Sequence, residues 1–130
     1  MWQYHATLMI FGFSLTVAGA GVSRYMKNRP WWLRVHRRLE ISGALFSLLG
    51  LIMAIYYVQS TSGVHFRAPH ALLGAVTIAL VVITAVSGYA QLKSKTYGPK
   101  IRKIHPWLGR LTILLMLITI VGGLSLAGVI

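Results

Sequence analysis

Four long stretches of this sequence contain no charged residue, and they restrict the possible folds more than any other feature. Each stretch holds about twenty mainly apolar residues, the length that an α-helix needs to cross the ~30 Å hydrocarbon core of a membrane. Backbone groups in lipid must form their hydrogen bonds within the segment, so isolated apolar runs become helices. The uncharged stretches are residues 1–23, 41–66, 71–92 and 111–130.

We therefore predict an all-α fold, a transmembrane four-helix up-down bundle that forms a single domain over residues 1–130. The first run is not typical of a signal peptide, because no basic region precedes it and three similar runs follow. Pro106 falls in the first turn of the last predicted helix, where a missing N–H has no partner to lose. The helices are expected near residues 3–23, 34–58, 69–92 and 104–128.

The positive charge is concentrated in two of the three connections between these helices. The chain has 13 Lys and Arg against one acid, for a net charge of +12, yet 56% of it is hydrophobic. A nucleic-acid partner is excluded, because nucleic-acid-binding domains carry charge throughout. Only Arg67 lies in the middle connection, so the positive-inside rule places both termini outside. The first and third connections hold Arg24, Lys27, Arg29, Arg34, Arg37, Arg38, Lys93, Lys95, Lys100, Arg102 and Lys103.

One histidine stands near the start of each predicted helix and opens the pattern His-x-x-Leu. The spacing of 31 to 35 residues indicates a helical repeat. Small residues follow at steps of 4, 7, 14 and 18, which return to nearly the same helix face. Close helix packing explains the small residues, but it does not explain four ionisable side chains in register within a membrane. The histidines are His5, His36, His70 and His105.

Alternating helix direction sorts these histidines into two pairs. His5 and His70 share the outer leaflet, whereas His36 and His105 share the inner leaflet. Two imidazoles that face each other across a bundle suit the axial positions of one haem iron, which predicts two haem b groups. The haems are expected to be non-covalent because the chain has no cysteine. Room for the macrocycle is expected at Gly12, Gly43, Gly74 and Gly109.

Two alternatives to haem follow from the same histidines. Zinc prefers three or four converging ligands, usually with Cys, Asp or Glu among them. Here the ligands divide two and two, and Glu40, the one acid, is expected in a partly buried ion pair near Arg37. From a different class, the alternative is a haem-free four-helix membrane transporter or assembly subunit that uses its histidines for protons or metal ions.

Charged residues near the predicted haems are candidates for further contacts. Arginine offers planar, bidentate pairing to the anionic haem propionates, which favours Arg24, Arg37 and Arg110. His65 and Arg67 lie in the outer connection and are candidates for the outer haem edge. For His65, a solvated loop residue is the commoner outcome.

Several segments resemble the core of the cytochrome b561 family, especially the form linked to extracellular DOMON domains. They are "HATLMIFGFSLTVAGAGVSRYMK", "WWLRVHRRLEISGALFSLLG", "HALLGAVTIALVVITAVSGYAQL" and "IHPWLGRLTILLML". The most specific pieces are Arg24-Tyr25, Trp32 before His36, and His-x-x-Leu-Gly at His70 and His105. Members of that family typically have six helices, with one more on each side of the four predicted here.

The resemblance implies a diheme transmembrane electron carrier with the pairs His5/His70 and His36/His105. Family enzymes often take electrons from ascorbate on the cytoplasmic side and pass them to ferric iron or monodehydroascorbate. We therefore expect an integral protein of a bacterial or archaeal cytoplasmic membrane or of a eukaryotic membrane, embedded in the lipid bilayer. Ascorbate or quinol is the expected donor. A redox partner protein or domain is expected outside, in a homo-oligomer or a larger complex.

Overall fold

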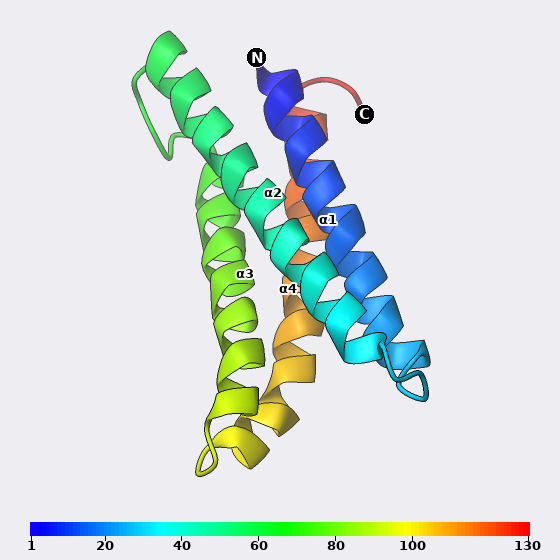
Figure 1. The fold of residues 1–130 in the computed structure, drawn as a ribbon. Coiled ribbons are helices and arrows are strands. Elements are labelled where there is room, and N and C mark those ends of the chain that lie inside the picture. The colour runs from blue at the N-terminus through cyan, green and yellow to red at the C-terminus, as the bar shows by residue number, and fades with distance from the viewer.

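The computed structural model describes residues 1–130 and contains four α-helices joined by short connections (Figure 1). The prediction of an all-α fold with four helices is confirmed. Every helix is long and apolar enough to cross a membrane. The helices are α1 (Trp2–Tyr25), α2 (Trp32–Thr61), α3 (Pro69–Lys93) and α4 (Gly98–Leu126).

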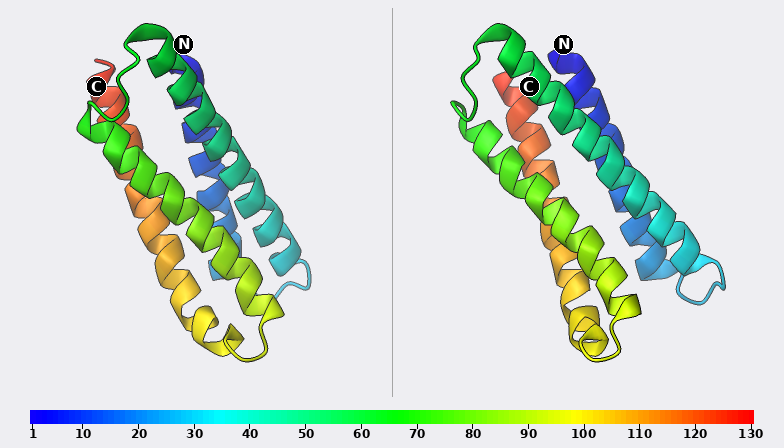
Figure 2. Two further views of the ribbon diagram at one scale, coloured as in Figure 1. Left: turned by 90° about the vertical axis from the view of Figure 1, so that its left-hand side faces the viewer. Right: turned by 60° about the vertical axis from the view of Figure 1, so that its left-hand side comes forward.

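Consecutive helices run in opposite directions, so both chain termini lie at the same end of the bundle as the α2–α3 connection (Figures 1 and 2). Helix α1 packs mainly on α2, and α3 packs mainly on α4. The two helix pairs meet more loosely through α1 with α4 and α2 with α3. Because α1 does not contact α3 and α2 does not contact α4, these two combinations are the diagonals of the bundle.

Small and polar side chains fill much of the interior of this bundle together with a few large ones such as Met116, while most large apolar side chains face outward. Ser47 and Thr77 are fully buried. Leu45 and Ile83, in contrast, expose 56% and 52% of their surface. Lipid chains are as apolar as leucine, so an outward apolar surface and a closely packed interior of small residues suit a membrane helix bundle.

Glycine allows the close approach of α1 and α2. A Cβ atom at Gly12 would lie 2.7 Å from the Ser47 hydroxyl and 2.9 Å from the Gly43 carbonyl oxygen. Gly12 and Gly43 therefore serve helix packing, and the expectation that they make room for a macrocycle stays a prediction. Gly74 and Gly109 have open space, since a Cβ would meet its first neighbour at 3.8 Å or find none within 4 Å.

Helix α4 begins at Gly98, earlier than expected, and this changes the position of Pro106. The prediction that this proline falls in the first turn is wrong, because it lies inside the helix, where it removes a backbone hydrogen bond. The first turns of α4 bend away from the rest of the helix (yellow in Figure 1). Proline is the usual cause of such a bend, and His105 directly precedes Pro106 in the chain.

Two threonine pairs connect α3 to α4. The hydroxyl oxygens are 2.9 Å apart in Thr77–Thr119 and 2.8 Å apart in Thr84–Thr112. Interhelical hydrogen bonds in membrane proteins contribute about 0.6 kcal/mol on average. We expect a double-mutant cycle of Thr77→Val and Thr119→Val, followed by unfolding in mixed micelles, to give a coupling energy of that size. A coupling of zero would mean that both hydroxyls bond only to their own helix.

Candidate functional site

Two histidine pairs lie between diagonal helices of the bundle. The imidazole centroids of His5 on α1 and His70 on α3 are 6.3 Å apart, and their planes make an angle of 80°. His36 on α2 and His105 on α4 have the same 6.3 Å separation and an angle of 81°. The structure thus brings the four histidines together in the combinations expected from helix direction.

The separation within each pair fits one iron atom between two imidazoles. A bond from a first-row metal to an imidazole nitrogen measures about 2 Å, and that nitrogen lies about 1 Å from the ring centroid, so two axial imidazoles place their centroids about 6 Å apart. No group of three or more His, Cys, Asp or Glu side chains is present. The arrangement therefore suits a bis-histidine haem better than zinc, which requires at least three protein ligands.

Backbone carbonyls of the neighbouring helix orient two of these histidines. His5 donates a hydrogen bond from Nδ1 to the Gly50 carbonyl oxygen at 2.8 Å, and His36 donates from Nδ1 to Gly19 at 2.9 Å. A carbonyl oxygen only accepts, so Nδ1 carries the proton and Nε2 keeps a free lone pair. Hydrogen bonding through the other ring nitrogen is the usual way in which proteins orient a metal-binding histidine.

Glycines also make room for the other two histidines, at the contact of α3 with α4. A Cβ atom at Gly123 would lie 2.7 Å from Cε1 of His70, and one at Gly88 would lie 3.1 Å from Cε1 of His105. His105 Nδ1 lies 2.9 Å from the Ser87 hydroxyl. Each ring therefore packs directly against backbone, which restricts the directions in which it can point.

These glycines recur at regular steps in the sequence, but the sequence alone assigns them no contact with the histidines. The signal was the step of fourteen residues from His5 to Gly19 and from His36 to Gly50, and the step of eighteen that follows the later two histidines. Because neighbouring helices are antiparallel, the glycine near the end of one helix lies beside the histidine near the start of its neighbour. Each of these glycines thus contacts the histidine of the neighbouring helix. The residue pattern within a single helix does not reveal this contact.

Glu40 lies beside the His36–His105 pair rather than beside an arginine. Its carboxylate is 3.7 Å from His36 Nδ1, and no Lys or Arg lies within ion-pair distance. The expectation of an ion pair near Arg37 is therefore wrong. The physical reason is helix rotation: Glu40 packs on Gly19 of α1, whereas Arg37 is exposed.

The predicted haem-edge and propionate residues lie on the surface of the bundle. The Arg110 guanidinium stacks 4.7 Å from the Trp107 ring centroid, and His65 Nε2 pairs with the Gln59 side-chain oxygen at 3.1 Å. Arg37 lines a hollow of about 240 Å³ with two neighbouring arginines. No hydrogen bond, ion pair or cation–π contact joins these side chains to the histidine pairs, and their proposed roles stay predictions. The exposed residues of this set are Arg24, Arg37, His65, Arg67 and Arg110.

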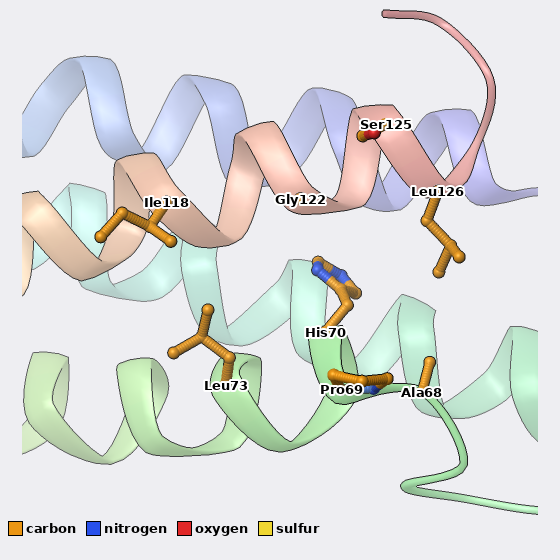
Figure 3. A pocket seen from close by; sticks show the side chains of 8 residues that line it. All are labelled: Ala68, Pro69, His70, Leu73, Ile118, Gly122, Ser125 and Leu126. Atoms are coloured by element: carbon orange, nitrogen blue, oxygen red, sulfur yellow. The ribbon is translucent and has the colours of Figure 1, made fainter.

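A cleft of about 620 Å³ lies beside His70, between the start of α3 and the end of α4 (Figure 3). Leu73 and Ile118 form part of its apolar lining, and Gly122 forms part of the α4 wall. His70 Nδ1 is buried and has no hydrogen-bond partner. Of the four imidazoles, only that of His70 has no hydrogen bond at Nδ1.

Comparison with known families explains why paired histidines stand in a membrane bundle. The chain matches the model for eukaryotic cytochrome b561 over residues 4–128. It belongs to the cytochrome b561 family. Comparison with curated proteins and with solved structures gives no match. The cytochrome b561 family binds haem b, and membership indicates an integral membrane protein that transfers electrons through haem b.

Proposed function

We propose that this chain is a diheme b-type cytochrome that carries electrons across a membrane. The donor is ascorbate or quinol on the cytoplasmic side, and the acceptor is a small molecule or a redox partner on the outer side. The observation that carries the proposal is the presence of two separate histidine pairs, each with centroids 6.3 Å apart, in a family that binds haem b.

In this proposal His5 and His70 are the axial ligands of an outer haem, and His36 and His105 are those of an inner haem. Haem b, when bound, supplies one-electron redox chemistry. The Nδ1 hydrogen bonds of His5 and His36 support this assignment, because they leave Nε2 free to bind iron. Two axial histidines leave no open position on the iron, so oxygen activation is not expected.

The distance between the two sites follows from α2, which contributes to both. Its Gly50 carbonyl orients His5, while His36 lies fourteen residues earlier on the same helix. At 1.5 Å per residue these positions are about 21 Å apart along the helix axis. That is most of the ~30 Å hydrocarbon thickness, so one site stands near each membrane surface.

Charge supports the orientation and the partners in this proposal. The connections after α1 and α3 carry the basic residues, which supports a cytoplasmic position for them and an outer position for both termini. Arg24, Arg37 and Arg110 then lie on the side of the inner haem, where they are proposed propionate contacts. On the outer side, the exposed His65 and Arg67 offer a contact for a redox protein or domain. We also propose a homo-oligomer or a larger complex.

The haem content of the purified protein tests this function. We expect a reduced-minus-oxidised spectrum with a sharp b-type α band and two haems per chain by pyridine haemochrome assay. Absence of haem after expression in haem-replete cells would instead favour a haem-free transporter or assembly subunit. One haem per chain would contradict the diheme assignment while leaving the family intact.

A further inference from the structure

Helices α3 and α4 are related by a partial repeat of 35 residues, and one of the positions at which they differ faces the histidine of the neighbouring helix. The shift relates His70 to His105 and Gly88 to Gly123. Directly before each of those glycines, however, α3 has Ser87 and α4 has Gly122. One site therefore has a hydroxyl where the other has a hydrogen atom.

Ser87 fixes the protonation of the ring that it contacts. Its hydroxyl oxygen lies 2.7 Å from the carbonyl oxygen of Thr84 and 2.9 Å from Nδ1 of His105. A hydroxyl has one proton, and the carbonyl can only accept it. The Ser87 oxygen therefore accepts a hydrogen bond from the Nδ1–H of His105, which leaves Nε2 free for iron.

At the equivalent place on α4, Gly122 provides no such acceptor. His70 Nδ1 is buried and has no hydrogen bond of ordinary geometry, and the Thr119 carbonyl offers it at most a weak, poorly aligned contact. A Cβ atom at Gly122 would have nothing within 4 Å, and this residue opens onto the cleft beside His70. A side chain would therefore have room at Gly122, and packing does not explain the absence of a hydroxyl there.

The histidines on α1 and α2 show no such difference in their Nδ1 hydrogen bonds, although the Glu40 carboxylate also lies 3.7 Å from Nδ1 of His36. His5 and His36 both donate to glycine carbonyls, at 2.8 and 2.9 Å. The imbalance between the two sites therefore comes from α3 and α4: both rings of the His36–His105 pair have an Nδ1 acceptor, but only one ring of the His5–His70 pair does.

We propose that Ser87 and Gly122 are positioning residues that make the inner haem harder to reduce than the outer haem. The proposal rests on the diheme function above. A hydrogen bond from Nδ1 raises the basicity of the coordinating nitrogen, and a more basic axial ligand stabilises ferric over ferrous iron. These contacts alone favour movement of an electron from the His36–His105 site to the His5–His70 site, toward the outer side.

Reciprocal substitutions test the proposal in the haem-loaded protein. Ser87→Ala should raise the midpoint potential of the inner haem, and Gly122→Ser should lower that of the outer haem. The shift equals the difference in hydrogen-bond strength between ferric and ferrous iron. Its upper limit is therefore the whole net strength of an ordinary hydrogen bond, roughly a tenfold change in the ferric-to-ferrous ratio, which is about 59 mV for one electron. Spectroelectrochemical titration resolves each haem, and the g-values of the ferric EPR signals report ligand basicity independently of potential.

The matched control is Gly122→Ala, which adds the carbon atom but no hydroxyl. It should leave both potentials and both EPR signals unchanged, because only the hydrogen bond is invoked. Unchanged potentials in both Ser87→Ala and Gly122→Ser, or equal shifts in Gly122→Ser and Gly122→Ala, would overturn the proposal. A protein that contains no haem, or only one, would contradict the proposed diheme function instead. Counting the haems before the titration therefore distinguishes failure of that function from failure of the present proposal.

Discussion

Replacing His70 with glycine should reduce the haem content from two per chain to one. His70 lies 6.3 Å from His5 and contacts no part of the other pair, so its loss should leave the His36–His105 site intact. Haem counting by pyridine haemochrome and the α-band spectrum measure the result. His70→Gly also leaves a space into which free imidazole fits, and added imidazole should restore the second haem.

Two further variants provide controls for this experiment. His105→Gly should also leave one haem, but with the spectrum of the other site. His65→Ala should retain both haems, because His65 is exposed and pairs with Gln59 at the end of α2. Loss of both haems in His70→Gly without rescue by imidazole, or retention of both, would contradict the pairing of His5 with His70.

A single methyl group at Gly12 should destabilise the bundle. Its Cβ would lie 2.7 Å from the Ser47 hydroxyl and 2.9 Å from the Gly43 carbonyl oxygen, and the carbonyl belongs to a helix backbone that cannot rotate away. Overpacking of this kind costs about 1–3 kcal/mol. We therefore expect Gly12→Ala to lower the free energy of unfolding by about 2 kcal/mol, measured by denaturant titration in mixed micelles.

Gly21 on the same helix offers a matched control, since a Cβ there would have nothing within 4 Å. Gly21→Ala should be neutral or stabilising by up to about 1 kcal/mol, the gain of alanine over glycine in a helix. Adding Ser47→Ala to Gly12→Ala should recover only part of the loss, because the backbone contact remains. Equal effects of Gly12→Ala and Gly21→Ala would refute close packing of α1 on α2 as the role of Gly12.

Helix number and direction were predictable because they depend on local properties of the chain. An uncharged apolar run must become a helix in lipid wherever it lies, and short connections make neighbouring helices antiparallel. Helix direction alone then separates His5 and His70 from His36 and His105. Haem binding was predicted from these two histidine pairs, and the family, whose model spans residues 4–128, supports it.

Other features depended on which face each helix turns toward its neighbours. Glu40 contacts His36 instead of an arginine, and Gly12 packs on Gly43 of the neighbouring helix. The early start of α4, which puts Pro106 inside the helix, likewise depends on the fold around it. Periodicity places residues on one face, but it does not say which helix that face meets.

The sequence by itself determined four membrane-spanning helices and the two levels at which the histidines stand, because apolar length and chain direction are properties of single segments. Only the tertiary structure decided which group each imidazole bonds to. The acceptor for His5 is 45 residues away and that for His36 is 17 residues away, on helices whose rotation is set by glycine contacts. For the same reason, the difference between Ser87 and Gly122 could be interpreted only from the structure, in which Ser87 pairs with His105 and His70 has no Nδ1 partner.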